Sequence, residues 1–351
     1  MAVVTILGAG DMGTALATPL AANRHDVRLW GSDRDTAIVR ALQLGEPHLR
    51  LGTSLPRNVR AFSATAAEEA LAGAEIVVVA ITSDAVRLVL DQVASHLGRP
   101  RAIATVAKGF DPGVDGGEIL LLPDVIAEFS PAPVVAVGGP SKANEVARSI
   151  PTVVVFAGED TRAVALSGNT FRTDAYCIES TPDIAGVEIA AAMKNAYAIA
   201  LGIPDGLERV TGLPHHNLRA ALFPLAVREM GTLIDLYGGD RTTAGGLAGS
   251  GDLQVTITSG RNRLLGERIG RGETAGQAVT SLTAAGTTVE GFLAASFGYR
   301  LAQGFIAAGR AVPGHFPLLA ALHRILSEEA PPLPALWNAI QPSPRLIDSR
   351  G

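Results

Sequence analysis

The sequence predicts an α/β protein in which a doubly wound sheet is followed by an all-helical domain. Three observations predict this architecture. Short β-branched runs alternate with helical periods through the first half, a glycine loop separates the first run from the first helix, and strand patterns stop near residue 183. We expect the sheet domain over residues 1–183 and the helical domain over residues 184–351.

The expected strands are short and bounded by turn residues. Residues 74–82 carry the strongest signal, because β-branched side chains would lie on both faces of a fully buried strand. The other strands are expected at residues 3–7, 26–33, 101–110, 132–141 and 151–158. Helices are expected between them, including residues 14–25, where Pro19 should kink or end the helix.

From residue 184 onward, apolar residues recur with a helical period. Helical segments are expected at 186–203, 218–238, 262–272 and 289–305, with a short helix and a frayed end after Pro331. The first segment is almost wholly small or apolar, yet Lys194 lies on its apolar stripe. Taken alone, Lys194 could be a core lysine whose amine reaches water. Alternatively it is a catalytic acid or base, because apolar surroundings lower the pKa of an amine toward neutral pH.

Composition and charge exclude several classes of function. The chain has 351 residues, 47% hydrophobic and 18% charged, which suits a two-domain globular protein. A net charge of -5 without a dense Lys/Arg run argues against nucleic-acid binding. The single cysteine, Cys177, gives no sign of an oxidising compartment. We expect no signal peptide, no membrane span and a cytoplasmic location. His215 and His216 lack a completing ligand, so no metal site is expected.

A glycine loop after the first strand indicates a Rossmann-type dinucleotide site. Gly8, Gly10 and Gly13 form G-x-G-x-x-G directly between a strand and a helix. Glycines allow the tight turn and the approach of a pyrophosphate, and the helix N-terminus offers free N–H groups. The alternative is a tight turn without a ligand. Asp11, in the first helical turn, could cap backbone N–H groups rather than repel a diphosphate.

The end of the second strand bears on the choice between NAD and NADP. An acidic residue at this place binds the ribose 2′-hydroxyl of NAD, whereas a nearby arginine accommodates the 2′-phosphate of NADP. Ser32 occupies this place, with Asp33 and Arg34 just beyond it. The pattern fits either cofactor and favours NADP slightly.

Several polar residues could hold an anionic substrate. Lys108 is expected at a strand end, where such sheets bind ligands, and Ser141 follows the next strand. In the helical half, Asp252 follows a glycine-rich turn, and Arg261 and Asn262 open a helix. An arginine at a helix N-terminus favours an anionic partner, and its guanidinium suits a phosphate. The alternatives are a surface lysine and a solvated basic turn.

Together these motifs resemble a known family. GAGDMGTAL, VAKGF, GGPS-x-A-x-E, AAMKNAYAIA, GSGDL, GRNR and VEGF occur in the order typical of NAD(P)-dependent sn-glycerol-3-phosphate dehydrogenases of the bacterial and archaeal type. The resemblance covers roughly residues 3 to 325. It implies a Rossmann domain, a helical domain, a homodimer, and interconversion of dihydroxyacetone phosphate and glycerol 3-phosphate, which supplies the backbone of glycerophospholipids.

The resemblance also implies roles for individual positions. Lys194 would be the general acid/base and Asp252 an active-site acid. Lys108 would touch both cofactor and substrate, and Arg261 with Asn262 would bind the substrate phosphate. The other substrate contacts would be Gly139, Ser141 and Gly260. The other cofactor contacts would be Gly8, Gly10, Asp11, Met12, Gly13, Ser32, Ala143, Thr288 and Glu290, with Arg261 also near the cofactor.

The chain departs from the family pattern at several positions. Gly260 stands where many members have serine, Met12 where many have an aromatic residue, and Lys142 where a hydrophobic residue is usual. The loop after Asp252 is slightly shorter than in many bacterial members and resembles that of archaeal-type members.

Other functions stay open at this point. A β-hydroxyacid or 6-phosphogluconate dehydrogenase would carry asparagine four residues after the lysine, where this chain has Ala198. A dehydrogenase for another phosphorylated ketone fits the same residues. A dinucleotide sensor without turnover is disfavoured, because Lys194 and Asp252 are both present. The favoured mechanism is hydride transfer to the C2 carbonyl of a small phosphorylated ketone, with Lys194 as proton donor.

Overall fold

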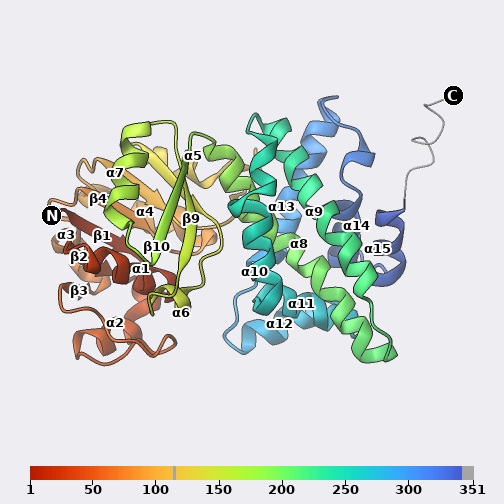
Figure 1. Ribbon diagram of the computed structural model, residues 1–351, viewed down its shortest axis with the longest axis horizontal. Helices are drawn as coiled ribbons and strands as arrows, with labels where there is room; N and C mark the ends of the chain where they lie inside the picture. The colour runs from red at the N-terminus through yellow and green to blue at the C-terminus, as the bar shows by residue number, and fades with distance from the viewer. Residues whose placement is uncertain (114–115, 342–351) are drawn as a thin grey trace. The chain divides into compact units, whose positions relative to one another are not determined.

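The chain divides into two compact units, Met1–Ala191 and Ala192–Gly351. The structure is a computed structural model, and it describes residues 1–113 and 116–341. Unit 1 contains the sheet, and unit 2 is built of helices (Figure 1). Helix α8 (Ile184–Thr211) begins in unit 1 and continues into unit 2. The domain boundary expected between residues 183 and 184 falls at the start of this helix and stays a prediction.

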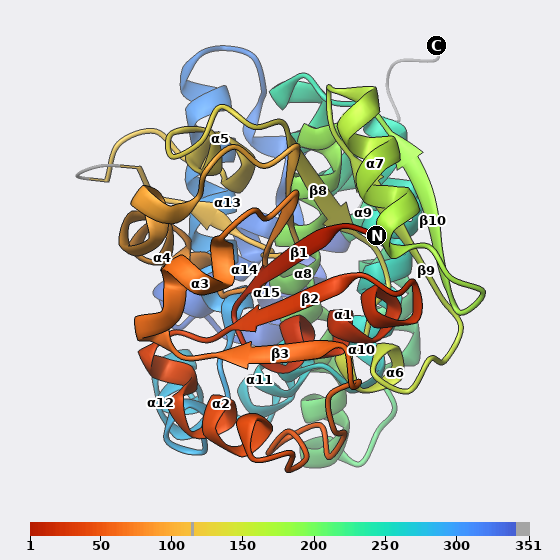
Figure 2. The same cartoon turned by 90° about the vertical axis from the view of Figure 1, so that its left-hand side faces the viewer.

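An eight-stranded sheet forms the centre of unit 1, in the order β10-β9-β8-β5-β4-β1-β2-β3. Neighbouring strands are parallel except β8 and β9, which pair antiparallel. Figure 2 shows β1, β2 and β3 side by side and pointing the same way. The strands are β1 (Val3–Leu7), β2 (Asp26–Trp30), β3 (Val59–Phe62), β4 (Ile76–Val79), β5 (Ala102–Thr105), β8 (Val134–Gly138), β9 (Thr152–Ala157) and β10 (Tyr176–Thr181). The expected doubly wound architecture is confirmed.

The strand order predicts a ligand site at the carboxyl ends of the central strands. From β1 the chain runs outward through β2 and β3, then returns to β4 on the other side of β1. Ligands of doubly wound sheets bind at the carboxyl ends of the strands, where the strand order reverses. The glycine loop follows β1 and therefore lies at this switch point.

Helices and one small hairpin connect the strands. The helices of unit 1 are α1 (Asp11–Ala22), α2 (Thr36–Gln43), α3 (Ala67–Leu71), α4 (Val86–Val93), α5 (Leu122–Ala127), α6 (Ala143–Val146) and α7 (Thr161–Phe171). The hairpin pairs β6 (Phe110–Asp111) with β7 (Leu120–Leu121). Helix α1 ends three residues after Pro19, so the proline lies in its last turn and is buried there.

The sequence did not predict the strands β3 and β10, which are the two edges of the sheet. Each of the two has a neighbouring strand on one side only, and both lack the continuous apolar run of a central strand. In β10, buried and exposed residues alternate from Tyr176 to Glu179. In β3, Arg60 is exposed between buried Val59 and half-buried Ala61.

Unit 2 packs its helices around α8. They are α9 (His216–Tyr237), α10 (Asp252–Ser259), α11 (Arg261–Gly270), α12 (Ala275–Ala284), α13 (Glu290–Ala307), α14 (Pro317–Ser327) and α15 (Pro332–Ile340), with a π-helical turn at Leu247–Gly251. The short helix expected after Pro331 is α15, and most of its expected frayed end lies outside the described residues.

Helix α8 is long and apolar enough to cross a membrane by length and composition. Its most apolar window has a mean hydropathy of 1.3, and 89% of that window is buried inside the protein. A helix that is apolar on every side is typical of the core of a large domain. We therefore interpret α8 as a core helix.

Glycines let α8 and α11 approach each other closely. A Cβ atom at Gly266 would lie 1.9 Å from the carbonyl oxygen of Ile199, and one at Gly202 would lie 2.1 Å from that of Arg263. No side chain fits at such distances, so only glycine allows this spacing of the two backbones. The close packing fixes the start of α11 against the middle of α8, where Lys194 lies.

Candidate functional site

The loop Gly8–Gly13 has the backbone that dinucleotide binding requires. Gly8 has φ +115°, and a Cβ atom there would lie 2.4 Å from the carbonyl oxygen of Ala80. A Cβ atom at Gly13 would lie 2.0 Å from the carbonyl oxygen of Gly8. A Cβ atom at Gly10 would meet nothing within 4 Å, so this glycine leaves the loop open on one side. Two glycines thus make the turn, and the third leaves space for a phosphate to approach the backbone.

The N-terminus of α1 is available for an anion. Gly10 caps this helix and provides no side-chain hydrogen bond to its first N–H groups. The expectation that Asp11 caps these groups is wrong, because the structure shows no side-chain cap at this helix end. The carboxylate of Asp11 instead accepts a hydrogen bond of 2.7 Å from Arg50 Nε, and it lies 3.9 Å from Nε2 of His48. These groups draw the acid into an ion pair, and the fit to a diphosphate at α1 is preserved.

Ser32 lies just after β2 and is held in place by Asp35. The backbone N–H and the hydroxyl of Ser32 each donate a hydrogen bond of 3.1 Å to Oδ2 of Asp35. The exposed Arg34 lies beside them, with its guanidinium 3.7 Å from Asp84. The carboxylate of Asp35 is thus engaged by Ser32, and Asp33, directly after Ser32, is exposed.

Lys108 and Gly139 meet at the carboxyl edge of the sheet. Strand β5 ends at Thr105, three residues before Lys108. The strand expected at residues 101–110 is therefore shorter than predicted, and Lys108 lies in the loop that follows it. Lys108 Nζ donates a hydrogen bond of 3.4 Å to the carbonyl oxygen of Gly139, which follows β8. Ser141 Oγ lies 3.9 Å from Sδ of Met12 in the glycine loop. The loops after β1, β5 and β8 therefore converge, and Ala143 follows as the first residue of α6.

Lys194 carries a buried amine with two hydrogen bonds. Its exposed fraction is 7%, and its Nζ donates to Oδ1 of Asp252 at 2.9 Å and to Oγ1 of Thr256 at 2.8 Å. Ala190 and Ala198, one turn away on either side, are fully buried. The interpretation of Lys194 as a core lysine that reaches water is therefore wrong. The amine is held inside the protein by polar partners.

Helix α10 presents Asp252 and Thr256 on one face, because residues four apart lie one turn apart. Thr256 Oγ1 also donates a hydrogen bond of 2.7 Å to the carbonyl oxygen of Asp252, which fixes its rotamer. The opposite face carries Gln254 and Thr258, which line a separate cavity. Asp252 was expected from the sequence, whereas Thr256 was not. The i, i+4 spacing was the signal that could have found it.

An amide pair joins α8, α11 and α13 beside Lys194. Asn262 Nδ2 donates to Oδ1 of Asn195 at 3.0 Å, and Asn262 Oδ1 accepts from the N–H of Gly291 at 3.0 Å. Both side chains are buried. Glu290, the first residue of α13, is adjacent to Gly291, and Thr288 lies exposed in the preceding loop. The structure thus gathers Asn195, Asn262 and Glu290 in unit 2.

Arg261 is the exposed first residue of α11, and the structure gives it no ion pair among the described residues. The helix N-terminus is capped by Gly260, without a side-chain hydrogen bond. A Cβ atom at Gly260 would lie 2.2 Å from the carbonyl oxygen of Thr256, so serine does not fit here without a shift of the backbone. A guanidinium and free N–H groups together suit a phosphate.

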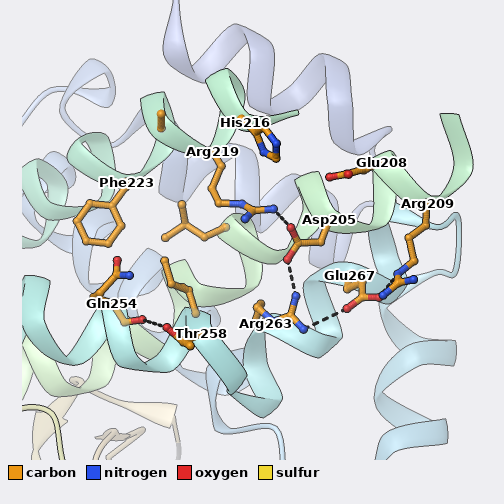
Figure 3. A pocket seen from close by; sticks show the side chains of 13 residues that line it. Asp205, Glu208, Arg209, His216, Arg219, Phe223, Gln254, Thr258, Arg263 and Glu267 are labelled. Carbon is orange, nitrogen blue, oxygen red and sulfur yellow. Dashed lines mark hydrogen bonds and ion pairs between the residues drawn. The ribbon is translucent and has the colours of Figure 1, made fainter. Parts of the chain in front are cut away.

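A cavity of about 780 Å³ in unit 2 holds a network of ion pairs (Figure 3). Arg219 and Arg263 both bind Asp205, and Arg263 and Arg209 both bind Glu267. Each arginine is thus paired with a carboxylate. The positive charges of these arginines are therefore neutralised, whereas Arg261 has no ion pair among the described residues. The pairing favours a structural role for the network.

Comparison with known families covers nearly the whole chain. Residues 3–164 match the family described as NAD-dependent glycerol-3-phosphate dehydrogenase N-terminus, and residues 183–336 match its C-terminus. The NADP(+)-dependent glycerol-3-phosphate dehydrogenase of Archaeoglobus fulgidus is 35% identical over 333 residues, which are 93% of this chain and 95% of that protein. The glycerol-3-phosphate dehydrogenase [NAD(P)+] of Halorhodospira halophila is 34% identical over 97% of both chains.

Solved structures agree with these matches. The crystal structure of glycerol-3-phosphate dehydrogenase from Coxiella burnetii has a TM-score of 0.82 and 30% sequence identity, over 97% of this chain and 99% of that one. The yeast glycerol-3-phosphate dehydrogenase has a TM-score of 0.80 at 21% identity over 97% and 99%, which supports the fold.

Proposed function

The chain belongs to the family of NAD-dependent glycerol-3-phosphate dehydrogenases, and we propose that it interconverts dihydroxyacetone phosphate and sn-glycerol 3-phosphate. It is an oxidoreductase that uses NAD or NADP. One observation carries the proposed chemistry: the buried amine of Lys194 is oriented by Asp252 and Thr256 on a helix of small residues.

Lys194 is the general acid/base. In the reducing direction its ammonium donates a proton to the C2 oxygen, which becomes a hydroxyl, and in the oxidising direction the neutral amine takes this proton back. The bound reduced cofactor supplies the hydride. Asp252 and Thr256 hold the amine in one orientation, which lowers the entropy cost of reaching the transition state. Small side chains at Ala190 and Ala198 leave room beside the amine.

Arg261 and Asn262 bind the substrate phosphate at the N-terminus of α11. The support is the exposed guanidinium, the uncapped helix and the buried amide of Asn262. Gly260 contributes its backbone, and Lys108, Gly139 and Ser141 are proposed as further substrate contacts. Phosphate binding supplies energy away from the reacting carbon, and this energy positions C2.

The glycine loop and its neighbours bind the dinucleotide. Gly8, Gly10, Gly13 and the N-terminus of α1 take the pyrophosphate, and Ser32 lies at the ribose. The further contacts proposed in unit 1 are Asp11, Met12, Lys108 and Ala143, and Arg261, Thr288 and Glu290 stay predictions from the resemblance. The small side chain of Ser32 and the nearby Arg34 favour NADP, as does the cofactor named for the Archaeoglobus relative.

We also propose a cytoplasmic homodimer. Trp337 and Leu333 are 55% and 39% exposed on α15, and large apolar side chains at a surface favour association. Light scattering after gel filtration tests the dimer, and a monomer at micromolar concentration contradicts it.

A purified enzyme assay tests the proposed reaction. Oxidation of NADH or NADPH is followed with dihydroxyacetone phosphate and with a panel of other phosphorylated ketones. Faster turnover of another ketone would identify a dehydrogenase with a different substrate. Cofactor binding without turnover of any ketone would identify a sensor.

A further inference from the structure

Glu188 on α8 is a buried acid without a hydrogen-bond partner among the described residues. Its exposed fraction is 1%, and neither carboxylate oxygen has a protein partner. The adjacent Val187 and Ile189 are fully buried. Another buried helical acid, Glu229, accepts hydrogen bonds from Tyr197 Oη and from two backbone N–H groups. Leaving an ionised carboxylate buried and unpaired costs several kcal/mol. Unlike Glu229, Glu188 has no hydrogen bonds that offset this cost.

Two charged groups act on this carboxyl, and both belong to unit 1. Lys108, beyond the end of β5, favours the ionised form, and Asp124 on α5 opposes it. Burial is the largest influence and raises the pKa of Glu188 to about 8. Lys108 is also the lysine proposed above to contact cofactor and substrate. The ionised acid and an anionic ligand therefore interact with the same ammonium.

We propose that an anionic ligand binds at Lys108 together with a proton on Glu188. This inference rests on the proposed ligand contact of Lys108. Two anions beside one ammonium repel each other in surroundings of low polarity. Where Glu188 is ionised before binding, it takes up a proton from solvent as the ligand arrives, and no other bond forms or breaks. When Glu188 is ionised instead, it pairs electrostatically with Lys108 and competes with the ligand.

The direction of the pH effect follows from this linkage. Below pH 8 the acid is protonated before binding, and the ligand affinity is independent of pH. Above pH 8 a proton must be taken up for binding, and the dissociation constant rises by up to about tenfold per pH unit. The effect depends on Glu188 and Lys108, because Asp124 only shifts the pH at which it begins.

NADH binding between pH 6.5 and 9.5 tests the proposal, because NADH has no group that titrates near pH 8. For the wild type, we expect the dissociation constant to rise several-fold between pH 7.5 and 9. For Glu188→Gln, which keeps the shape of the side chain, we expect a change of less than twofold. Glu179→Gln, at an exposed acid of β10, is the matched control and should behave as the wild type. An equal pH dependence in wild type and Glu188→Gln overturns the proposal, as does an affinity lowered equally at all pH values.

Calorimetry gives a second measurement that does not require the variant to fold. NADH is titrated into the wild type at pH 8.5 in two buffers of different ionisation enthalpy. We expect proton uptake, and the absence of uptake overturns the proposal. Neither measurement needs turnover, so failure to reduce dihydroxyacetone phosphate would reject the proposed reaction and leave this linkage standing.

Discussion

The amine of Lys194 lies 2.9 Å from Oδ1 of Asp252, and both residues are almost fully buried. They are 58 residues apart in sequence and meet where α10 packs against α8. A buried ion pair of this kind is strongly destabilised when one partner is removed, because the other charge stays unpaired. The pair therefore bears on both the activity and the folding of unit 2.

Replacing Lys194 by alanine should abolish proton transfer. We expect kcat to fall by about 10²- to 10⁴-fold, since general acid–base catalysis contributes this much. NADH binding should be unchanged, and the measurement is steady-state kinetics beside a fluorescence titration. Activity near the wild-type level would remove the acid/base assignment. Lys194→Met, which keeps a long unbranched side chain, controls for the space left by alanine.

Replacing Thr256 by valine should remove one hydrogen bond to the amine while keeping the shape of the side chain. We expect kcat to fall by roughly tenfold, in line with the loss of one hydrogen bond to a charged group, with little change in KM. Thr258→Val is the matched control on the same helix, because the Thr258 hydroxyl bonds only to the carbonyl of Gln254 in the described structure. Equal effects of the two substitutions would show that Thr256 does not orient Lys194.

Replacing Arg261 by alanine should weaken phosphate binding. A charge-assisted hydrogen bond contributes about 1.5–3 kcal/mol, so KM for dihydroxyacetone phosphate should rise roughly ten- to hundredfold. Arg324→Ala, at an exposed arginine of α14, is the control and should leave KM unchanged. An unaltered KM in Arg261→Ala would reject the phosphate role.

Replacing Ser32 by aspartate should shift the cofactor preference toward NAD. A carboxylate at this place accepts hydrogen bonds from the ribose hydroxyls and repels a 2′-phosphate. The ratio of kcat/KM for NADH to that for NADPH should increase at least tenfold. An unchanged ratio would mean that this position does not distinguish the 2′ group.

Glu229 predicts a pH dependence of stability. Burial raises its pKa to about 7 from an ordinary value of 4.5, although the N–H groups of Leu318 and Leu319 and the Tyr197 hydroxyl favour ionisation. A raised pKa means that the folded state holds this proton more tightly than the unfolded state. The resulting stability is fully present below pH 4.5 and is lost as pH rises through 7.

The difference amounts to the order of 3 kcal/mol in the free energy of unfolding. Urea unfolding of the wild type between pH 5 and 8 should therefore show a steeper decline than Glu229→Gln, which keeps only the decline due to other groups such as Glu188. Parallel pH profiles for the two proteins would contradict the assignment.

The sequence determined the architecture and the identity of most candidate residues. The central strands are apolar over their whole length, and the glycine loop stands between a strand and a helix, so local pattern was sufficient. The edge strands β3 and β10 escaped prediction because exposed residues interrupt their apolar runs. The helical spacing of apolar residues predicted the helices of the second half. Short sequence motifs identified Lys194, Asp252 and Arg261 as candidates.

Tertiary structure decided the partners of these residues. No local pattern pairs Lys194 with Asp252 and Thr256, joins Asn195 to Asn262, or directs Asp11 toward Arg50 instead of its own helix. Such contacts depend on how closely helices pack, and for α8 and α11 this depends on glycines at both surfaces. The same holds for Glu188, since burial depends on the whole fold, and burial makes an ordinary acid titrate near neutral pH.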